Sequence, residues 1–197
     1  MSPKQLRGEV TSELLLDTAL RVFAASGEQG LTVNAVIRES GVSLGSLYHH
    51  FGSIDGLIAT LCHRWLDRLL GELATALRES GSAREGIAAA VRAYLTFVQE
   101  HREPALLLHS PLADRKSMTR GKEFRDAQEA RISEVGLWIR LHIESGELAP
   151  LPLPLIESLV MGPVVAVARR SLSGIDDVGI DEAARLLPER IWRSVRA

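Results

Sequence analysis

Apolar residues recur along this chain at the three- and four-residue spacing of helices, almost from end to end. Between residues 16 and 24 they fall at i, i+3, i+4, i+7 and i+8, which predicts an amphipathic helix over residues 11–26. The same reasoning predicts further helices over residues 32–40, 44–51, 53–81, 83–101, 104–109, 122–145, 154–173 and 180–195. No alternating segment or hairpin signal interrupts this pattern, so we expect an all-helical fold.

Glycines, hydroxyl residues and prolines mark where these helices begin and end. Thr32 and Ser43 precede apolar runs as N-caps, and Gly41 provides the left-handed conformation that ends a helix sharply. Gly162-Pro163 predicts a bend in the helix over 154–173, and Pro188 predicts a kink or a split in the last helix.

Composition narrows the class of protein. The 197 residues are 46% hydrophobic and 24% charged, which is ordinary for a globular chain of one domain, or of a large domain carrying a small one. A single cysteine, Cys62, indicates a reducing cytoplasm, and we expect it to be a small core residue, with thiol sensing as a minor alternative. The charged first ten residues predict no signal peptide, and no apolar run is long enough to span a membrane.

Residues 32–51 have the spacing of a helix-turn-helix, with a first helix to Ser40, a turn through Gly41 and Val42, and a second helix from Leu44. Val36, Ile37, Leu47 and Phe51 are expected to hold the two helices together. The other face of the second helix is small at its start and then carries a phenol and two imidazoles, which can donate hydrogen bonds to phosphates or base edges.

At this point the sequence resembles the TetR (tetracycline-repressor-like) regulators. The resemblance lies in LLLDTALRVFAASG, GLTVNAVIRESGVS and LGSLYHHFGSIDGL, and in the later ESGELAP. It implies about nine helices, with an N-terminal helix-turn-helix domain over residues 1–53 and a ligand-binding and dimerisation bundle over residues 54–197. It also implies a DNA-binding transcriptional regulator that is not an enzyme and has no cofactor or metal.

Carried over by position, the resemblance assigns DNA contacts to one short segment and an arm. The contact residues are Thr32, Val33, Ser43, Leu44, Gly45, Ser46, Tyr48, His49 and His50, with Lys4 and Arg7 in a flexible N-terminal arm. Two departures weaken the expected phosphate clamp, because the family often has a lysine where Leu44 stands and nearly always one where Ile54 stands.

The net charge of the predicted DNA-binding region also indicates a weak general attraction to phosphate. Residues 1–64 hold five Lys or Arg and six Asp or Glu, a net charge of −1. Binding should therefore depend on placed contacts, helix N-termini and dimerisation. Because the salt slope is about −0.9 per phosphate contact, we expect a shallower slope than dimeric repressors usually show.

Two other motifs have competing interpretations. The segment Gly41–Gly45 matches the G-x-S-x-G elbow of hydrolases, but that elbow needs a preceding strand, and a helical pattern precedes it here. His49 and His50 are adjacent, so on a helix they point about 100° apart and cannot chelate one ion. We expect them to contact phosphate, with plain solvent exposure as the alternative.

The second half of the chain offers candidates for a ligand pocket and for a dimer interface. Large apolar and histidine side chains are expected to line the pocket: Tyr94, Phe97, Leu107, His109, Phe124, Trp138, Leu141, His142, Met161 and Val165. For each residue singly, ordinary core packing is the alternative. The isologous interface is expected on the last two helices, at Leu159, Val160, Val164, Leu187, Ile191 and Val195.

These expectations combine into one mechanism. A cytoplasmic homodimer binds palindromic operator DNA as a repressor, and a small apolar effector in the bundle releases it, with the helix over 53–81 as the lever. The alternative is a helical small-molecule carrier or an enzyme on the same scaffold, without DNA binding.

Overall fold

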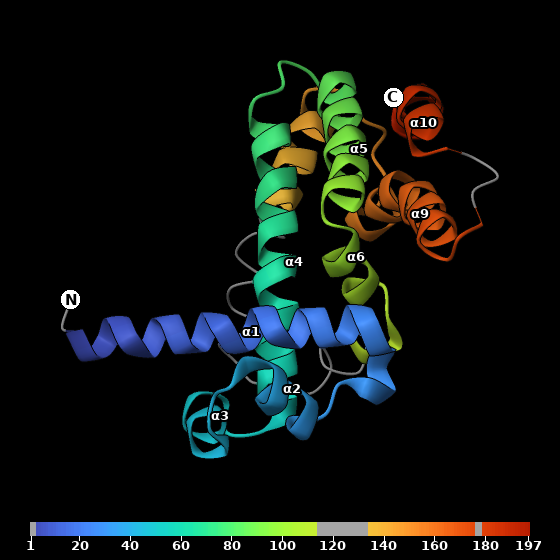
Figure 1. The fold of residues 1–197 in the computed structure, drawn as a ribbon. Coiled ribbons are helices and arrows are strands. Elements are labelled where there is room, and N and C mark those ends of the chain that lie inside the picture. Colours follow the sequence, from blue (N-terminus) through green and yellow to red (C-terminus); the bar gives the residue numbers. More distant parts are fainter. Residues whose placement is uncertain (1–2, 114–133, 176–178) are drawn as a thin grey trace. The chain divides into compact units, whose positions relative to one another are not determined.

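The computed structural model describes residues 3–113, 134–175 and 179–197, and these are helical as the sequence predicts (Figure 1). The helices are α1 (Pro3–Gly30), α2 (Val33–Ser40), α3 (Leu44–Phe51), α4 (Ile54–Arg78), α5 (Ala83–Glu100), α6 (Arg102–Leu108), helical segments over residues 111–113 and 134–144, α9 (Leu153–Leu172) and α10 (Ile180–Val195). Within these ranges the β structure is one isolated antiparallel bridge, between Leu148 and Arg196. In the same ranges, no helix has the length and apolar character needed to cross a membrane.

The chain forms two compact units. The first, which we call the head, comprises Met1–Leu66 with Glu103–Gly121, and the second, the bundle, comprises Asp67–Arg102 with Lys122–Ala197. Helix α4 supplies residues 54–66 to the head and 67–78 to the bundle. The functional boundary after residue 53 stays a prediction, because this division reflects packing alone.

The head has its own apolar core. Leu15 of α1, Leu47 of α3, Leu57 of α4 and Leu107 of α6 are completely buried in one cluster. At the edge of that cluster the Arg64 guanidinium reaches Glu13 and Asp17 of α1, each at 2.7 Å. The first half of α4 is therefore fixed to α1 by buried leucines and by a two-armed ion pair.

The bundle is built around α5, which packs against both α9 and α10. The start of α5 is paired with the later part of α10 through Arg84 and Glu189 at 2.7 Å, and its end is bonded to Asp181 through Gln99 at 2.9 Å. Helices α5 and α10 therefore run antiparallel. The C-terminus is held by backbone bonds, since Ala149 N–H donates to the Val195 carbonyl at 2.8 Å.

The largest differences from the sequence prediction concern α1 and α10. Helix α1 begins at Pro3, eight residues before the predicted start at Thr11, and Leu6, Val10 and Leu14 continue the i, i+4 spacing on it with exposed side chains. Gly27 does interrupt α1 (φ 65°, ψ −166°), but helix resumes to Gly30. Pro188 does not split α10, which runs without a break from Ile180 to Val195. The first part of the helix predicted over 122–145 lies outside the described residues.

Candidate nucleic-acid interface and ligand cavity

The helix-turn-helix is set by local hydrogen bonds. Thr32 Oγ1 accepts from Ala35 N–H, and Ser43 Oγ accepts from Ser46 N–H, each at 3.2 Å, so both predicted N-caps are confirmed. Gly41 has φ 68° and ψ 6° and donates its N–H to the Ile37 carbonyl at 3.0 Å. A side chain at this left-handed position would be strained, so the glycine permits the tight turn between the two helices.

Packing then decides which face of α3 points outward. Val36 and Leu47 are fully buried, while Val42 and Phe51 are partly buried against the head core. The opposite face of α3 is exposed. It presents Ser43, Leu44, Gly45, Tyr48 and His49, with Ser46 half-buried beside them. The structure therefore gathers most of the predicted contact residues on one short surface, which we call the α3 face.

Five predicted contact residues lie elsewhere. Thr32 is exposed and Val33 half-buried at the start of α2. The His50 ring is half-buried and lies toward α1, where a Cβ on Gly8 would be 3.6 Å from its Cε1 atom. Arg7 and Lys4 lie within helix α1, so the expectation of a flexible arm is wrong.

The α3 face lacks cations of its own. Leu44 is half exposed at the helix start, and Ile54 opens α4 beside Asp55, so the two lysines of the family pattern are absent. At that end of α4, Ser53 Oγ accepts from Gly56 N–H at 2.9 Å. What this surface offers to DNA is hydroxyl, phenol, imidazole and backbone N–H groups.

The structure also places Cys62 and the residues that could bind a metal. Cys62 is buried in the head core with 6% of its surface exposed, as predicted for a small core residue. No group of three or more His, Cys, Asp or Glu side chains suited to a metal occurs in the part of the chain that the structure describes.

The bundle contains a cavity of about 400 Å³. Its walls come from the second half of α4, from α5, from the helix over 134–144 and its following loop, and from α9. The lining side chains include Leu73, Leu77, Ile87, Ala90, Val135, Trp138, Ile139, Leu148, Ile156 and Met161, with Val160, Glu157 and Ser158 from α9. Predominantly apolar lining at this size is typical of small-molecule sites.

Of the predicted pocket residues, Trp138 and Met161 line this cavity. Tyr94 and Phe97 are instead buried in the packing of the bundle, and Leu107 is core of the head, where His109 also lies. Leu141 is 54% exposed, and Phe124 lies outside the described residues. Val165 is half-buried outside the lining, and His142 stands behind Trp138. Side-chain size alone did not distinguish a cavity wall from a filled core.

Tyr94 shows why a buried polar group need not belong to the cavity. Burial raises the pKa of its phenol to about 12, and the nearby charge of Arg169 offsets this only in part. The phenol therefore stays neutral over the whole physiological range and acts as a core residue.

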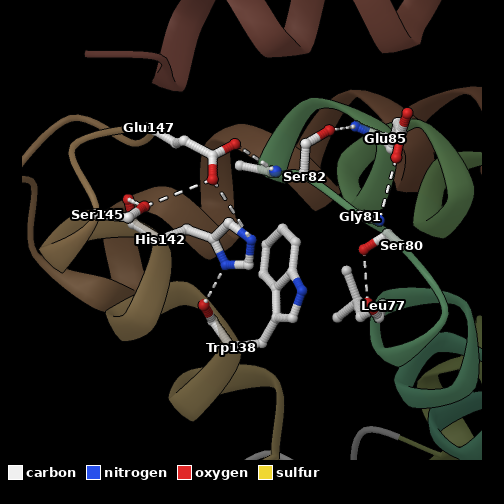
Figure 2. A network of polar contacts seen from close by, with 10 residues as sticks. Leu77, Ser80, Gly81, Ser82, Glu85, Trp138, His142, Ser145 and Glu147 are labelled. Atoms are coloured by element: carbon white, nitrogen blue, oxygen red, sulfur yellow. Dashed lines mark hydrogen bonds and ion pairs between the residues drawn. The ribbon is translucent and has the colours of Figure 1, made fainter.

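A polar network holds the Trp138 wall in place (Figure 2). The His142 ring stacks on the indole with centroids 4.1 Å apart, and its Nδ1 lies 2.8 Å from the Trp138 carbonyl oxygen. Glu147 Oε1 lies 3.9 Å from His142 Nε2, and Glu147 Oε2 accepts from Ala83 N–H at the start of α5 at 2.8 Å. The wall is thereby linked to the first turn of α5.

Gly86 of α5 completes that arrangement from the other side. A Cβ placed on Gly86 would lie 2.3 Å from Trp138 Cζ2, so the indole occupies the space that any other residue would fill. Gly86 is thus a positioning residue for the cavity. Sequence analysis missed it because the need for a small residue arises from a tryptophan far along the chain.

The predicted interface residues divide into two groups. Val164, Ile191 and Val195 are buried inside their own protomer, at 0%, 3% and 0% exposure, so they cannot contact a second copy. Leu159, Val160 and Leu187 are half-buried, and Val160 lines the cavity. The apolar periodicity identified the inward faces of α9 and α10. It did not show whether these faces are covered by helices of the same chain or by a second copy.

Comparison with known proteins agrees with the helix-turn-helix geometry. Residues 15–61 match the family model described as bacterial regulatory proteins, tetR family. The chain is 30% identical over 90 residues to the HTH-type transcriptional regulator BetI of Rhizobium meliloti (strain 1021), covering 46% of this chain and 44% of BetI. It is 30% identical over 103 residues to the HTH-type transcriptional repressor KstR2 of Mycolicibacterium smegmatis (strain ATCC 700084 / mc(2)155), covering 52% and 50%.

These curated relatives match over about half of their own length or less. A solved structure extends the likeness of the fold to the whole chain. The crystal structure of a TetR family transcription regulator from Marinobacter aquaeolei VT8 superposes with a TM-score of 0.78 at 20% identity, covering 98% of both chains. At that identity the match supports the fold of the bundle and carries nothing about its ligand.

Proposed function

We propose that the chain is a cytoplasmic, ligand-responsive repressor of the TetR kind that binds operator DNA as a homodimer, since residues 15–61 match the model of the tetR family of bacterial regulatory proteins. The observation that carries this proposal is the α3 face, where a capped, glycine-terminated turn presents Tyr48 and small residues outward. Small residues at the start of a recognition helix let its backbone approach the major groove closely.

Two such heads would read successive major grooves of a palindromic site, about 34 Å apart. The interface that joins them would use exposed and half-buried apolar residues of α9 and α10, namely Leu155, Leu159, Leu186 and Leu187, in place of the buried valines. Light scattering should accordingly give twice the 21.5 kDa mass of one chain, and a stable monomer would contradict this part of the proposal.

The effector would occupy the bundle cavity and act through α4. This helix contributes Leu57 and Leu61 to the head core and Leu73 and Leu77 to the cavity wall. A ligand that favours one position of the second half of α4 biases the first half as well, because the helix is continuous from Ile54 to Arg78. A coupling of about 1–3 kcal/mol would change operator affinity by about 5- to 150-fold.

Selection of binding sites from random duplex DNA tests the proposal directly. Enrichment of a palindromic motif is the expected result. Failure to enrich any motif would favour the alternative of a helical carrier or enzyme.

Two variants then locate the DNA contact on the selected site. Tyr48→Ala should abolish the shift of that duplex, and Tyr48→Phe should separate the role of the hydroxyl from that of the ring. Tyr48 is 47% exposed, so the fold should survive both changes. Leu141→Ala, which alters a side chain of similar exposure in the bundle, is the matched control and should bind like the unmodified protein. Unchanged binding by Tyr48→Ala would exclude α3 as the recognition helix.

A further inference from the structure

The bundle cavity is chemically uneven. Most of its described lining is aliphatic or aromatic, and the polar groups lie together on α9, where Glu157 and Ser158 are consecutive. Among the described lining residues Glu157 is the charged one, and no lysine, arginine or histidine faces it there. The cavity therefore has an apolar body and one edge of negative charge.

Hydrogen bonding makes this edge an acceptor. The Ser158 hydroxyl donates to the Pro154 carbonyl at 2.7 Å, so its hydrogen is used within α9 and its oxygen keeps lone pairs. An ionised glutamate is also an acceptor without a donor. Both side chains can therefore accept a hydrogen bond from a donor group on a ligand.

A carboxylate ligand fits this edge poorly. Glu157 is half-buried and Ser158 is exposed, so this edge stays in contact with solvent. A carboxylate head there would lie beside the like charge of Glu157, with no cation among the described lining residues to pair with it. A hydroxyl or ammonium head would instead donate to Ser158 or Glu157 while its hydrocarbon part covers the leucines. The flat Trp138 wall, held by His142 and Gly86, bounds the apolar part.

We infer that the cavity binds a neutral or cationic amphiphile, with an apolar body and a hydroxyl or ammonium head, and discriminates against the matching carboxylate. This inference rests on the proposed function only in taking the cavity as the effector site.

Three probes with the same alkyl chain test the preference: decan-1-ol, decylamine and decanoate, titrated by calorimetry below their aggregation limits into the full-length protein at neutral pH. The alcohol and the amine should each bind about tenfold or more tightly than decanoate, because the carboxylate of decanoate would lie beside the carboxylate of Glu157. Decanoate binding as tightly as the other two would overturn the inference.

Substitutions tie the preference to Glu157. Glu157→Gln should weaken decylamine relative to decanol, because the ammonium loses its charged partner, and should raise the affinity for decanoate. Glu144→Gln is the matched control, since Glu144 is an exposed carboxylate outside the lining, and it should change nothing. An unchanged order of affinities in Glu157→Gln would also overturn the inference.

Filling the cavity tests the location. Ala90→Leu adds volume to a buried wall position, and Met161→Trp adds it from α9 should the first variant fold poorly. Both should weaken all three probes, and binding that survives both would place the ligand elsewhere. If no probe binds, the inference fails, whereas operator binding, measured on the same protein without ligand, decides the DNA-binding part of the proposed function separately.

Discussion

The head and the bundle are made of the same kind of amphipathic helix, yet their candidate sites are specified in opposite ways. The α3 face comes from one stretch of twenty residues, 32–51, in which the two caps and the left-handed glycine each make a hydrogen bond to a residue three or four positions away. The cavity collects side chains from Leu70 to Met161 and has no local signature of its own. Local hydrogen bonds fix the first site, and long-range packing fixes the second.

This contrast makes the two sites differ in what breaks them. A DNA-contact residue on the α3 face can change without loss of fold, because it is exposed. A cavity residue is also a packing residue, so its substitution alters binding and stability together. The difference can be measured by substituting residues in each unit and monitoring unfolding through the fluorescence of one tryptophan in that unit. Trp65 reports on the head in a chain carrying Trp138→Phe and Trp192→Phe. Trp138 reports on the bundle in a chain carrying Trp65→Phe and Trp192→Phe.

The largest effect is expected where the local site depends on its core. Leu47 of α3 is completely buried, and Leu47→Ala should destabilise the head by about 2–5 kcal/mol through lost burial and a cavity. Denaturation followed by Trp65 should show the loss, and DNA binding should fall with it. Leu44→Ala, an exposed residue three positions earlier, is the control for stability. Equal stability of both variants would mean that α3 is not held by this core.

The next effect concerns the Trp138 wall. Gly86→Ala places a methyl group 2.3 Å from Trp138 Cζ2, so the indole must move, at a cost of about 1–3 kcal/mol. The emission of Trp138 should shift and probe binding in the cavity should weaken, while Trp65 in the head reports no change.

Gly162 of α9 offers a matched control for that substitution. A Cβ there meets nothing within 4 Å, so Gly162→Ala should be neutral or stabilise the helix by up to about 1 kcal/mol. If Gly86→Ala behaves like Gly162→Ala, the close approach of Gly86 to Trp138 has no role in shaping the cavity.

A smaller effect is expected at the ion pair between α1 and α4. Arg64→Gln removes both 2.7 Å contacts, with Glu13 and Asp17, whose side chains are more than half exposed. The Arg64 side chain is 26% exposed, but solvent reaches both carboxylates and screens them, so the head should lose about 1 kcal/mol. Denaturation followed by Trp65 at low and high salt checks this, and Arg38→Gln, which alters an exposed arginine of α2, is the control. A loss as large as that of Leu47→Ala would show that charge, not the apolar core, holds α4 to the head.

The same contrast explains which features the sequence could predict. Thr32, Gly41 and Ser43 were identified correctly because capping and left-handed turns are properties of four or five consecutive residues. Val164 and Val195 were assigned to a dimer interface because periodicity shows that a face is covered, and not whether the cover is the same chain or a second copy.

The cavity was the least predictable feature. Tyr94 and Phe97 are as large as Trp138, but whether a large side chain lines a space or fills it depends on neighbours contributed by other helices. Gly86 is informative only once Trp138 is known to lie against it.

The smallest effect is expected at Glu189 on the outer surface of the bundle, which belongs to neither site. Hydrogen bonds from Arg193 and then Arg84 lower the pKa of Glu189 below its ordinary value of 4.5. A depressed pKa in the folded state contributes stability above the unfolded-state value, and that contribution disappears as the pH falls through the folded-state pKa. Because 40% of the Glu189 side chain is exposed, solvent and salt screen these interactions.

At neutral pH the melting temperature of Glu189→Gln should therefore be only slightly below that of the unmodified protein. This difference should vanish on acidification or with added salt. Melting curves of the two proteins against pH, followed by Trp138, provide the measurement. A large loss at neutral pH that persists in high salt would mean that the pairing of α5 with α10 depends on this ion pair. The bundle would then be held by a few placed polar contacts, and its contrast with the head would disappear.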